Sequence, residues 1–213
     1  MNNTLDQTRT IRKVRMQNKT RTIAEIGMLG AIATVLMLFE FPLPFIAPPF
    51  YEIDLSEVPV LVGAFALGPI AGATIELIKI LINLIINGTN TAFVGEIGNY
   101  ILGCSFIIPA ALIYKLKKTK TNALAGMIIG TITMTVFGCF FNAYVLLPTY
   151  AAAFGMPIDA IVGMGSAINA NITNVMTFVV MAVAPFNMIK GVVVSVLTLL
   201  IYKHISPILK GNR

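Results

Sequence analysis

The sequence predicts an all-α integral membrane protein with six transmembrane helices in one bundle and both termini on the cytoplasmic side. Of its 213 residues, 57% are hydrophobic and 11% are charged, whereas soluble domains carry about 25% charged residues. The hydrophobic residues form runs long enough to cross a bilayer, and most basic residues lie between or beside these runs. This composition excludes a soluble cytosolic enzyme, which needs polar side chains to cover its surface.

The first membrane helix is expected at residues 22–41, because about 20 apolar residues cross a hydrocarbon core of roughly 30 Å. It carries no small-residue cleavage pattern, so we interpret it as an anchor rather than a removed signal peptide. A basic segment, residues 1–21, precedes it. The next segment, residues 42–56, contains four prolines and is called here the proline-rich loop; its composition excludes a helix.

Apolar sequence then runs from Val58 to Ile86, interrupted at Gly68-Pro69. As one helix this stretch would be roughly 43 Å long, too long for a bilayer without strong tilt. A break at Gly68-Pro69 gives a short second span at about residues 57–68 and a third span after it. The proline-rich loop is then expected to fold inward above the short span. Non-helical backbone at membrane depth is tolerated where it lines a cavity, so this loop is a candidate binding element.

The rest of the chain completes a membrane domain of residues 22–207, followed by a basic tail of residues 208–213. Three further helices are expected at residues 92–114, 123–147 and 174–202, with a long connection at 148–173.

The basic residues decide the number of spans. Of the 15 Lys and Arg residues, 13 fall in three clusters, at Arg9–Arg21, Lys115–Lys120 and Lys203–Arg213. Six spans put all three clusters on one side, as the positive-inside rule requires, and five spans do not. The net charge of +6 does not indicate a nucleic-acid partner, because no basic stretch has interleaved aromatic residues or a known binding module.

Polar side chains inside the expected spans are costly and usually face a bundle interior or a cavity. They are Glu76, Lys79, Asn83, Glu96, Asn99, Asn142, Asn187 and Lys190. Glu76 and Lys79 lie three residues apart, a spacing that favours a structural ion pair. Lys190 has no acidic neighbour in sequence, so its partner must come from another helix or from a ligand. Together with Asn187 it suits the carbonyl and hydroxyl groups of a neutral polar solute, and Pro185 is expected to open the helix before them.

Two surface features have alternative explanations. Aromatic residues of the proline-rich loop, with Tyr144 and Tyr150, form either an interfacial belt or a platform that stacks on a flat ring. Small residues follow a helical stripe at Ala24, Gly27, Ala31 and Thr34, which permits close helix contact either within the bundle or with an external partner.

Several chemistries have no support in the sequence. There is no GxxxxGK[ST] phosphate loop, so the chain cannot hydrolyse ATP itself. The single histidine, His204, excludes a histidine-based metal cluster, and no nucleophile stands beside a general base. We therefore expect no enzymatic activity, no cofactor and no metal.

Several segments resemble the riboflavin-specific substrate-binding components of energy-coupling factor (ECF) transporters, over about residues 22–207. Phe41-Pro-Leu-Pro-Phe45, Ile53-Asp-Leu-Ser-Glu-Val-Pro59 and Phe65-Ala-Leu-Gly-Pro69 resemble the first outer loop and second helix of that family. Asn142 with Leu146-Leu-Pro-Thr-Tyr150, combined with Pro185-Phe-Asn-Met-Ile-Lys-Gly191, is more specific to the riboflavin group.

This resemblance implies capture of riboflavin, as a transported ligand, from outside a bacterial cell membrane. It implies that Asn142, Asn187 and Lys190 bind the vitamin, that Ile53 and Leu55 cover it, and that Asn99 lies on a pocket helix. It also implies that Gly27 and Ala31 pack on a transmembrane coupling subunit, with Gly27 replacing the usual alanine. Two cytoplasmic ATPases would then drive rotation of the loaded component in the membrane. The alternatives are a component for another vitamin and, from another class, an integral-membrane enzyme or assembly subunit.

Overall fold

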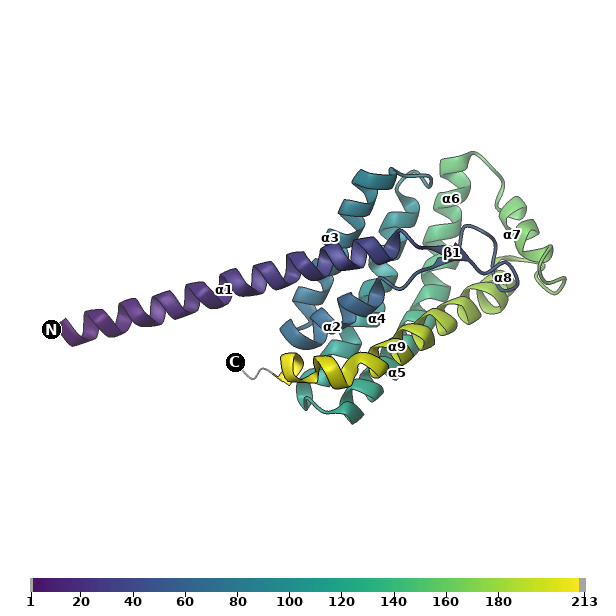
Figure 1. The fold of residues 1–213 in the computed structure, drawn as a ribbon. Helices are drawn as coiled ribbons and strands as arrows, with labels where there is room; N and C mark the ends of the chain where they lie inside the picture. Colours follow the sequence, from purple (N-terminus) through teal and green to yellow (C-terminus); the bar gives the residue numbers. More distant parts are fainter. Residues whose placement is uncertain (1, 211–213) are drawn as a thin grey trace.

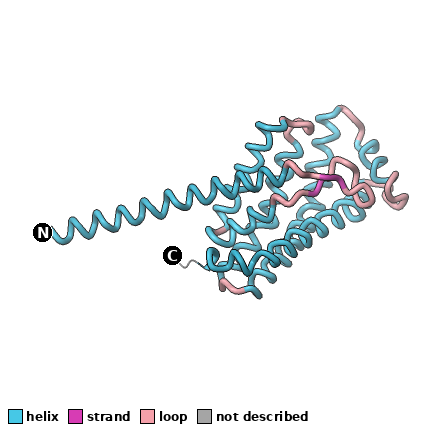
Figure 2. Tube along the Cα trace, in the orientation of Figure 1, coloured by secondary structure: helices cyan, strands magenta, loops and turns pink. Residues whose placement is uncertain are grey.

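The computed structural model describes the backbone of residues 2–210 and the side chains of residues 19–201 and 204. This part of the chain is almost entirely helical (Figures 1 and 2). Its helical elements are α1 (Asn2–Met37), α2 (Glu57–Leu67), α3 (Pro69–Asn87), α4 (Val94–Leu116), α5 (Lys120–Phe141), η1 (Asn142–Leu146), α6 (Leu147–Phe154), α7 (Ile158–Ser166), α8 (Val175–Phe178), η2 (Val179–Val183) and α9 (Ala184–Lys210). Two short strands, β1 (Phe41–Pro42) and β2 (Glu52–Ile53), pair antiparallel, and β1 begins one residue before the proline-rich loop.

Five helical stretches of the described chain have the length and apolar composition of a membrane span. They are Lys19–Met37, Pro69–Asn87, Val94–Leu116, Lys120–Phe154 and Val175–Ile201. The remaining expected span, α2, is apolar but has only 11 residues, or about 17 Å at 1.5 Å per residue. The six-span count therefore stays a prediction.

The expected break between α2 and α3 is confirmed. Gly68 joins the two helices with φ of 105°, a backbone conformation that residues other than glycine rarely adopt. Pro69 then begins α3, and proline is tolerated at a first helical position because the N–H it lacks has no intrahelical partner there.

The helix expected at residues 123–147 is longer than predicted, and the connection expected at residues 148–173 is partly helical. Helix α5 continues through the π-helical turn η1 into α6, and α7 follows. In η1 the N–H of Leu147 bonds the carbonyl of Asn142, five residues back, just before Pro148. A proline crowds the preceding turn, and the wider π turn accommodates it without ending the helix.

The last helix opens in the same way. The N–H of Ala184 bonds the carbonyl of Val179 in η2, immediately before Pro185. The opening expected at Pro185 is therefore a π-helical turn that leaves the chain helical on both sides.

The first helix differs from its expected bounds at both ends. It ends at Met37 instead of residue 41, because Phe41 and Pro42 belong to β1. It begins at Asn2, so its described backbone shows no break at the expected domain boundary between residues 21 and 22. The expected tail, residues 208–213, is described only to residue 210, as the end of α9.

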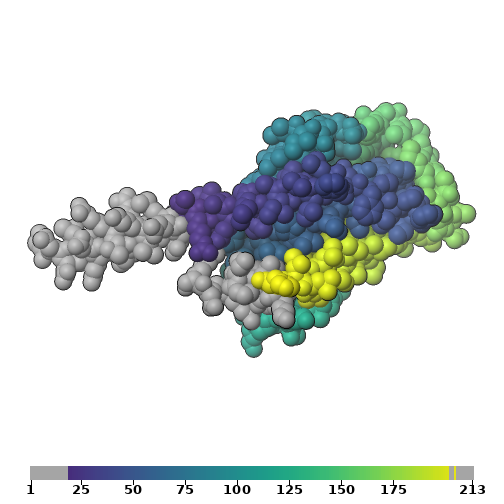
Figure 3. Space-filling model, viewed as in Figure 1, coloured from purple at the N-terminus to yellow at the C-terminus, as the bar shows by residue number. Residues whose placement is uncertain are grey.

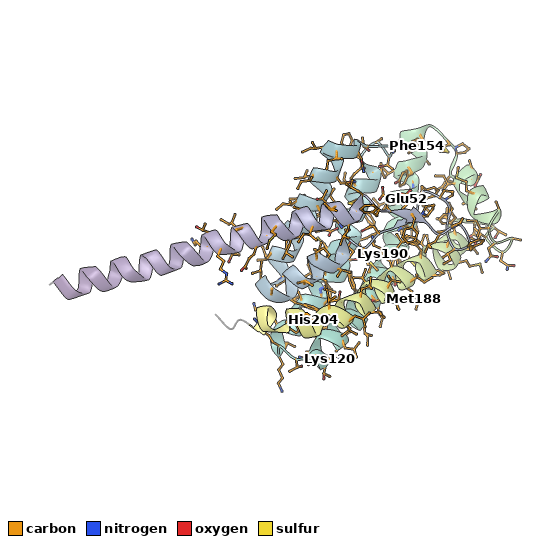
Figure 4. The ribbon with its side chains drawn as sticks, viewed as in Figure 1. Glu52, Lys120, Phe154, Met188, Lys190 and His204 are labelled. Carbon is orange, nitrogen blue, oxygen red and sulfur yellow. The ribbon has the colours of Figure 1, made fainter. Side chains whose placement is uncertain are left out.

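The two ends of the bundle differ in character. The strands, α7 and α8 lie at one end, and α1 projects beyond the other (Figure 1). Lys120 and His204 lie together toward the end from which α1 projects, and Glu52 and Phe154 lie toward the opposite end (Figure 4). The core has two parts. One surrounds Phe65 and Tyr114, whose rings stack at 4.5 Å, and the other packs beneath the proline-rich loop around Phe178.

Candidate functional site

A pocket of about 110 Å³ lies where the proline-rich loop meets the helices. Its lining comes from the loop and from α2, α4, α5, η1, α6 and α9. The lining residues are Phe50, Tyr51, Glu52, Glu57, Gly95, Gly98, Asn99, Leu102, Gly103, Met134, Asn142, Leu146, Tyr150, Phe186, Asn187 and Lys190. Four of the residues expected to bind a ligand, Asn99, Asn142, Asn187 and Lys190, are therefore brought together from three helices.

Asn142 is fully buried and opens the π turn η1. Its Oδ1 accepts a hydrogen bond from the hydroxyl of Tyr51 at 2.6 Å, and its Nδ2 donates to the carbonyl of Gly138 at 2.8 Å. Both polar atoms of the side chain thus have protein partners. Asn142 links α5 to the proline-rich loop, which fixes the Tyr51 ring at the pocket wall.

Asn187, by contrast, has an unpaired donor. Its side chain is buried, with 3% of the residue exposed, and Nδ2 has no hydrogen-bond partner in the described structure. Gly138 makes room for it, because a Cβ at that position would stand 2.5 Å from Nδ2. Asn99 on α4 has an unpaired acceptor instead, because its Oδ1 has no hydrogen-bond partner in the described structure. Buried polar atoms without partners are rare in folded proteins and require an explanation.

Lys190 finds its charge partners on segments far away in sequence. Its Nζ lies 3.5 Å from Oδ2 of Asp54 in the proline-rich loop and 3.8 Å from Oε1 of Glu57 on α2. Burial raises the pKa of the Asp54 carboxyl, but the ammonium groups of Lys190 and Lys79 and hydrogen bonding by Ser56 outweigh it and lower that pKa to about 2. Asp54 is therefore ionised at neutral pH and holds the loop against Lys190.

A second buried lysine extends this set of charges. Lys79 on α3 lies 2.7 Å from Oε1 of Glu76, the ion pair expected from their spacing, and also 3.1 Å from Oε1 of Glu57. Lys79, Glu76 and Glu57 are each at most 2% exposed. We call Asp54, Glu57, Glu76, Lys79 and Lys190 the buried charge cluster.

Aromatic rings close the pocket on the loop side. Phe50 contacts both Tyr51 and Tyr150, with ring centroids 4.9 and 5.9 Å apart, and Tyr51 packs on Phe186 at 5.4 Å. Two further cavities, of about 280 and 370 Å³, share Phe50, Glu52 and Tyr150 with the pocket. These three residues therefore stand between the pocket and a wider mouth.

The mouth contains an acidic group with an altered proton affinity. Desolvation, followed by repulsion from Glu52 and Asp54, raises the pKa of Glu40 to about 7. Glu40 lines the larger of the two outer cavities together with Glu52 and Glu96. The hydroxyl of Thr91 donates a hydrogen bond to Glu96 at 2.7 Å, which gives Glu96 a local structural contact.

Ile53 and Leu55 are not among the residues that line the pocket. Ile53 is 3% exposed and packs in the core beneath the loop, beside Phe178 and Phe186. Strand residues alternate in direction, and the flanking Glu52 takes the pocket side.

The small residues of α1 divide between two faces. Thr34 is buried, and its hydroxyl donates to the carbonyl of Gly30 at 2.9 Å. Ala24, Gly27 and Ala31 are exposed, and a Cβ at Gly27 would meet no other atom within 4 Å. Figure 3 shows α1 running along the outside of the bundle. Gly27 and Ala31 therefore do not pack within the described chain.

The sequence analysis missed Asp54 and Glu57 as partners of the buried lysines. One signal was available, because two lysines embedded in apolar sequence require counter-charges and the acids at positions 52, 54 and 57 form the nearest unassigned cluster. Among the described residues, no three His, Cys, Asp or Glu side chains are arranged to hold a metal ion.

Comparison with known proteins identifies the family. A family model described as ECF transporter, substrate-specific component, matches residues 21–202. The riboflavin transporter RibU of Staphylococcus aureus (strain TCH60) is 38% identical over 93% of this chain and 97% of its own length. The riboflavin transporter FmnP of Bacillus subtilis (strain 168) is 33% identical over 92% of this chain and 97% of its own.

A solved structure agrees with these relatives. It is described as the S component of a bacterial ECF transporter, shares 35% sequence identity and a TM-score of 0.71, and covers 90% of this chain and 99% of its own. Relatives that act in transport, together with several apolar helices, show a multi-pass cell-membrane protein with a transport role and no enzymatic one. The chain belongs to the family of ECF transporter substrate-specific components.

Proposed function

We propose that this chain captures riboflavin from outside the cell and delivers it inward, together with a transmembrane coupling subunit and two cytoplasmic ATPases. The named relatives are riboflavin transporters, and their similarity covers nearly the whole chain. The motif that is more specific to the riboflavin group supplies Asn142, Asn187 and Lys190, which all line one pocket.

The unpaired polar atoms of this pocket carry the proposal. Asn187 offers a buried donor and Asn99 a buried acceptor, and neither has a protein partner. The isoalloxazine ring of riboflavin has carbonyl acceptors beside an N–H donor, and its ribityl chain has hydroxyls that do both. Aromatic rings of Phe50, Tyr51 and Tyr150 suit the flat face of such a ring system. Lys190 would donate to a carbonyl or hydroxyl oxygen, and Asn142 would hold Tyr51 in place.

The loop must move for the ligand to enter. At about 110 Å³ the pocket is smaller than the roughly 300–1,000 Å³ of typical ligand sites. Separation of Phe50 and Tyr150 would join it to the outer cavities, whose lining they share. Ile53 and Leu55 would then cover the ligand indirectly, by packing the loop onto the helices.

The proposed topology has six membrane helices with both termini in the cytoplasm. It is supported by the position of Lys120 and His204, at the bundle end opposite Glu52 (Figure 4). A pocket beside Glu52 then opens outward. The exposed residues Gly27 and Ala31 suit close packing of a coupling-subunit helix, since small side chains let membrane helices approach each other.

Riboflavin titration of the purified protein tests the proposed ligand. We expect flavin to co-purify, to absorb visible light in the folded protein and to be released on denaturation. Quenching of flavin fluorescence would give the dissociation constant. The proposal fails if flavin neither co-purifies nor binds, and binding of a different vitamin in parallel titrations would identify a component with another specificity.

A further inference from the structure

The buried charge cluster contains one more acid than base. Three carboxyl groups, from Asp54, Glu57 and Glu76, face two amino groups, from Lys79 and Lys190, at N···O distances of 2.7–3.8 Å. Ionised groups are costly to bury unless their hydrogen-bonding capacity is satisfied. The cluster therefore has one more carboxyl group than it has ammonium groups.

Of the three carboxyl groups in the cluster, that of Glu57 is the one that lines the pocket. Its Oε1 is shared by the two lysines, at 3.1 Å from Lys79 and 3.8 Å from Lys190. Its Oε2 is buried and has no hydrogen-bond partner in the described structure. Glu57 also lines the pocket, as Lys190 does, whereas Glu76 and Lys79 do not.

We propose that Glu57 is a ligand-binding residue whose Oε2 accepts a hydrogen bond from an N–H or O–H group of the bound flavin, and that Lys79 is the residue that positions it. This inference rests on the proposed function. A carboxylate accepts only, so it complements the donors Lys190 and Asn187 on the same pocket. A charge-assisted hydrogen bond of this kind is stronger than a neutral one.

The surrounding structure holds Glu57 in this place. Lys79 is completely buried and bridges Glu57 and Glu76 from α3, so Glu57 cannot leave its position without removing one of the two carboxyl partners of a buried ammonium group. Gly103 on α4 keeps the space open, because a Cβ there would lie 3.2 Å from Oε1 of Glu57 and 2.5 Å from Oε1 of Glu76. The carboxylates thus pack against bare backbone at the pocket wall.

Riboflavin and two analogues provide a test that separates ligand contact from support of the fold. Lumiflavin lacks the ribityl hydroxyls, and 3-methylriboflavin lacks the ring N–H donor. We expect Glu57→Gln to weaken riboflavin binding by roughly 10- to 100-fold. That loss should disappear for whichever analogue lacks the donor that Glu57 accepts. An equal loss for all three ligands, or no loss for any, would overturn the proposal.

Two further variants protect the test against misfolding. Glu57→Asp keeps the charge and withdraws the oxygens by one methylene, so it should reproduce the analogue-dependent loss in a folded protein. The double variant Lys79→Met/Glu76→Gln removes the support of Glu57 by replacing one acid and one base with uncharged side chains. The double variant should weaken riboflavin binding. If Lys79 acts through Glu57, adding Glu57→Gln to it should lower the affinity little further. A full additional loss of affinity would show that Lys79 does not position Glu57.

The matched control is Glu25→Gln, at an exposed ion pair with Arg21 on α1. We expect its affinity for all three flavins to equal that of the unaltered protein. Failure of the unaltered protein to bind any flavin is a separate outcome, which would reject the proposed function and with it this assignment. If the unaltered protein binds riboflavin but Glu57→Gln lowers the affinity for all three flavins equally, the role of Glu57 as a ligand-binding residue is rejected and the proposed function stands.

Discussion

Lys190 of α9 and Asp54 of the proline-rich loop form a part-buried ion pair, with Nζ 3.5 Å from Oδ2, across 136 residues of sequence. Asp54 also accepts a hydrogen bond from the backbone N–H of Ser56 at 2.6 Å, so the carboxylate is anchored on the loop. The separation from Lys190 is long for a charge-assisted hydrogen bond, which leaves the ammonium group able to engage another acceptor. A ligand that bonds Lys190 would therefore also change how firmly the loop is held.

Removal of the Lys190 ammonium group should weaken riboflavin binding. Lys190→Met keeps much of the aliphatic stem but loses the donor, and we expect a loss of about 1–3 kcal/mol of binding free energy. Fluorescence titration measures it. Lys120→Met, at the opposite end of the bundle, is the control (Figure 4). Unchanged affinity in Lys190→Met would remove this residue from the site.

A single added methyl group should displace Asn187. In Gly138→Ala the new Cβ would stand 2.5 Å from Nδ2 of Asn187, closer than packed atoms allow. We expect riboflavin affinity to fall by roughly tenfold or more, since one buried polar contact is lost or misplaced. Gly163→Ala is the matched control, because its Cβ would meet nothing within 4 Å. Equal affinities in the two variants would show that Asn187 does not contribute.

The exposed small residues of α1 should separate binding from transport. Gly27→Leu and Ala31→Leu add bulk on a face that packs on no part of the described chain, so riboflavin binding should be retained. Uptake by cells should be lost, because a partner helix could no longer approach. Phe140→Leu, an exposed position on α5, serves as the control in the same uptake assay. Loss of binding in the α1 variants would contradict this assignment.

Glu40 should make stability depend on pH near neutrality. The pKa of its carboxyl is raised to about 7 by desolvation and by the nearby carboxylates, above the ordinary value of 4.5. The folded state therefore binds a proton more tightly than the unfolded state, and the free energy of unfolding falls as pH rises from 4.5 through 7. Asp54, with a pKa of about 2, stays ionised over this range.

Thermal unfolding of the unaltered protein and Glu40→Gln, followed by tyrosine fluorescence between pH 5 and pH 8, measures this dependence. We expect the variant to have the higher midpoint temperature at pH 8 and a flatter profile. Parallel profiles for the two proteins would contradict the altered pKa of Glu40.

Local sequence determined most of the helices and their breaks. Long apolar runs predict membrane helices because they are long enough to cross the hydrocarbon core and avoid water there. Gly68-Pro69 predicts the break between α2 and α3 because an unbroken helix would be too long for the bilayer. The continuation of α5 into α6 was not predictable in this way. Pro148 reads as a helix end, and only the π turn before it shows how the helix continues.

The candidate site also combines residues that local sequence predicts with residues that only the tertiary structure brings together. Asn99, Asn142, Asn187 and Lys190 were singled out with four other polar residues because polar groups are costly inside apolar helices, whatever the surrounding fold. The roles of Asn99 and Asn142 in ligand binding came from the resemblance to the riboflavin group. The charge cluster was not predicted beyond the Glu76–Lys79 pair, because side chains on one helix meet through the helical repeat whereas Asp54 and Glu57 meet Lys190 only after α9 has packed.

By itself, the sequence determined that this is a membrane protein of apolar helices, with its basic residues gathered between them and a few polar groups kept inside. Those properties depend on composition and on spacing along one helix. The tertiary structure decided which polar atoms have partners and which are buried without one. That outcome depends on side chains that come together only when the loop, α2, α3, α4 and α9 close around the same pocket.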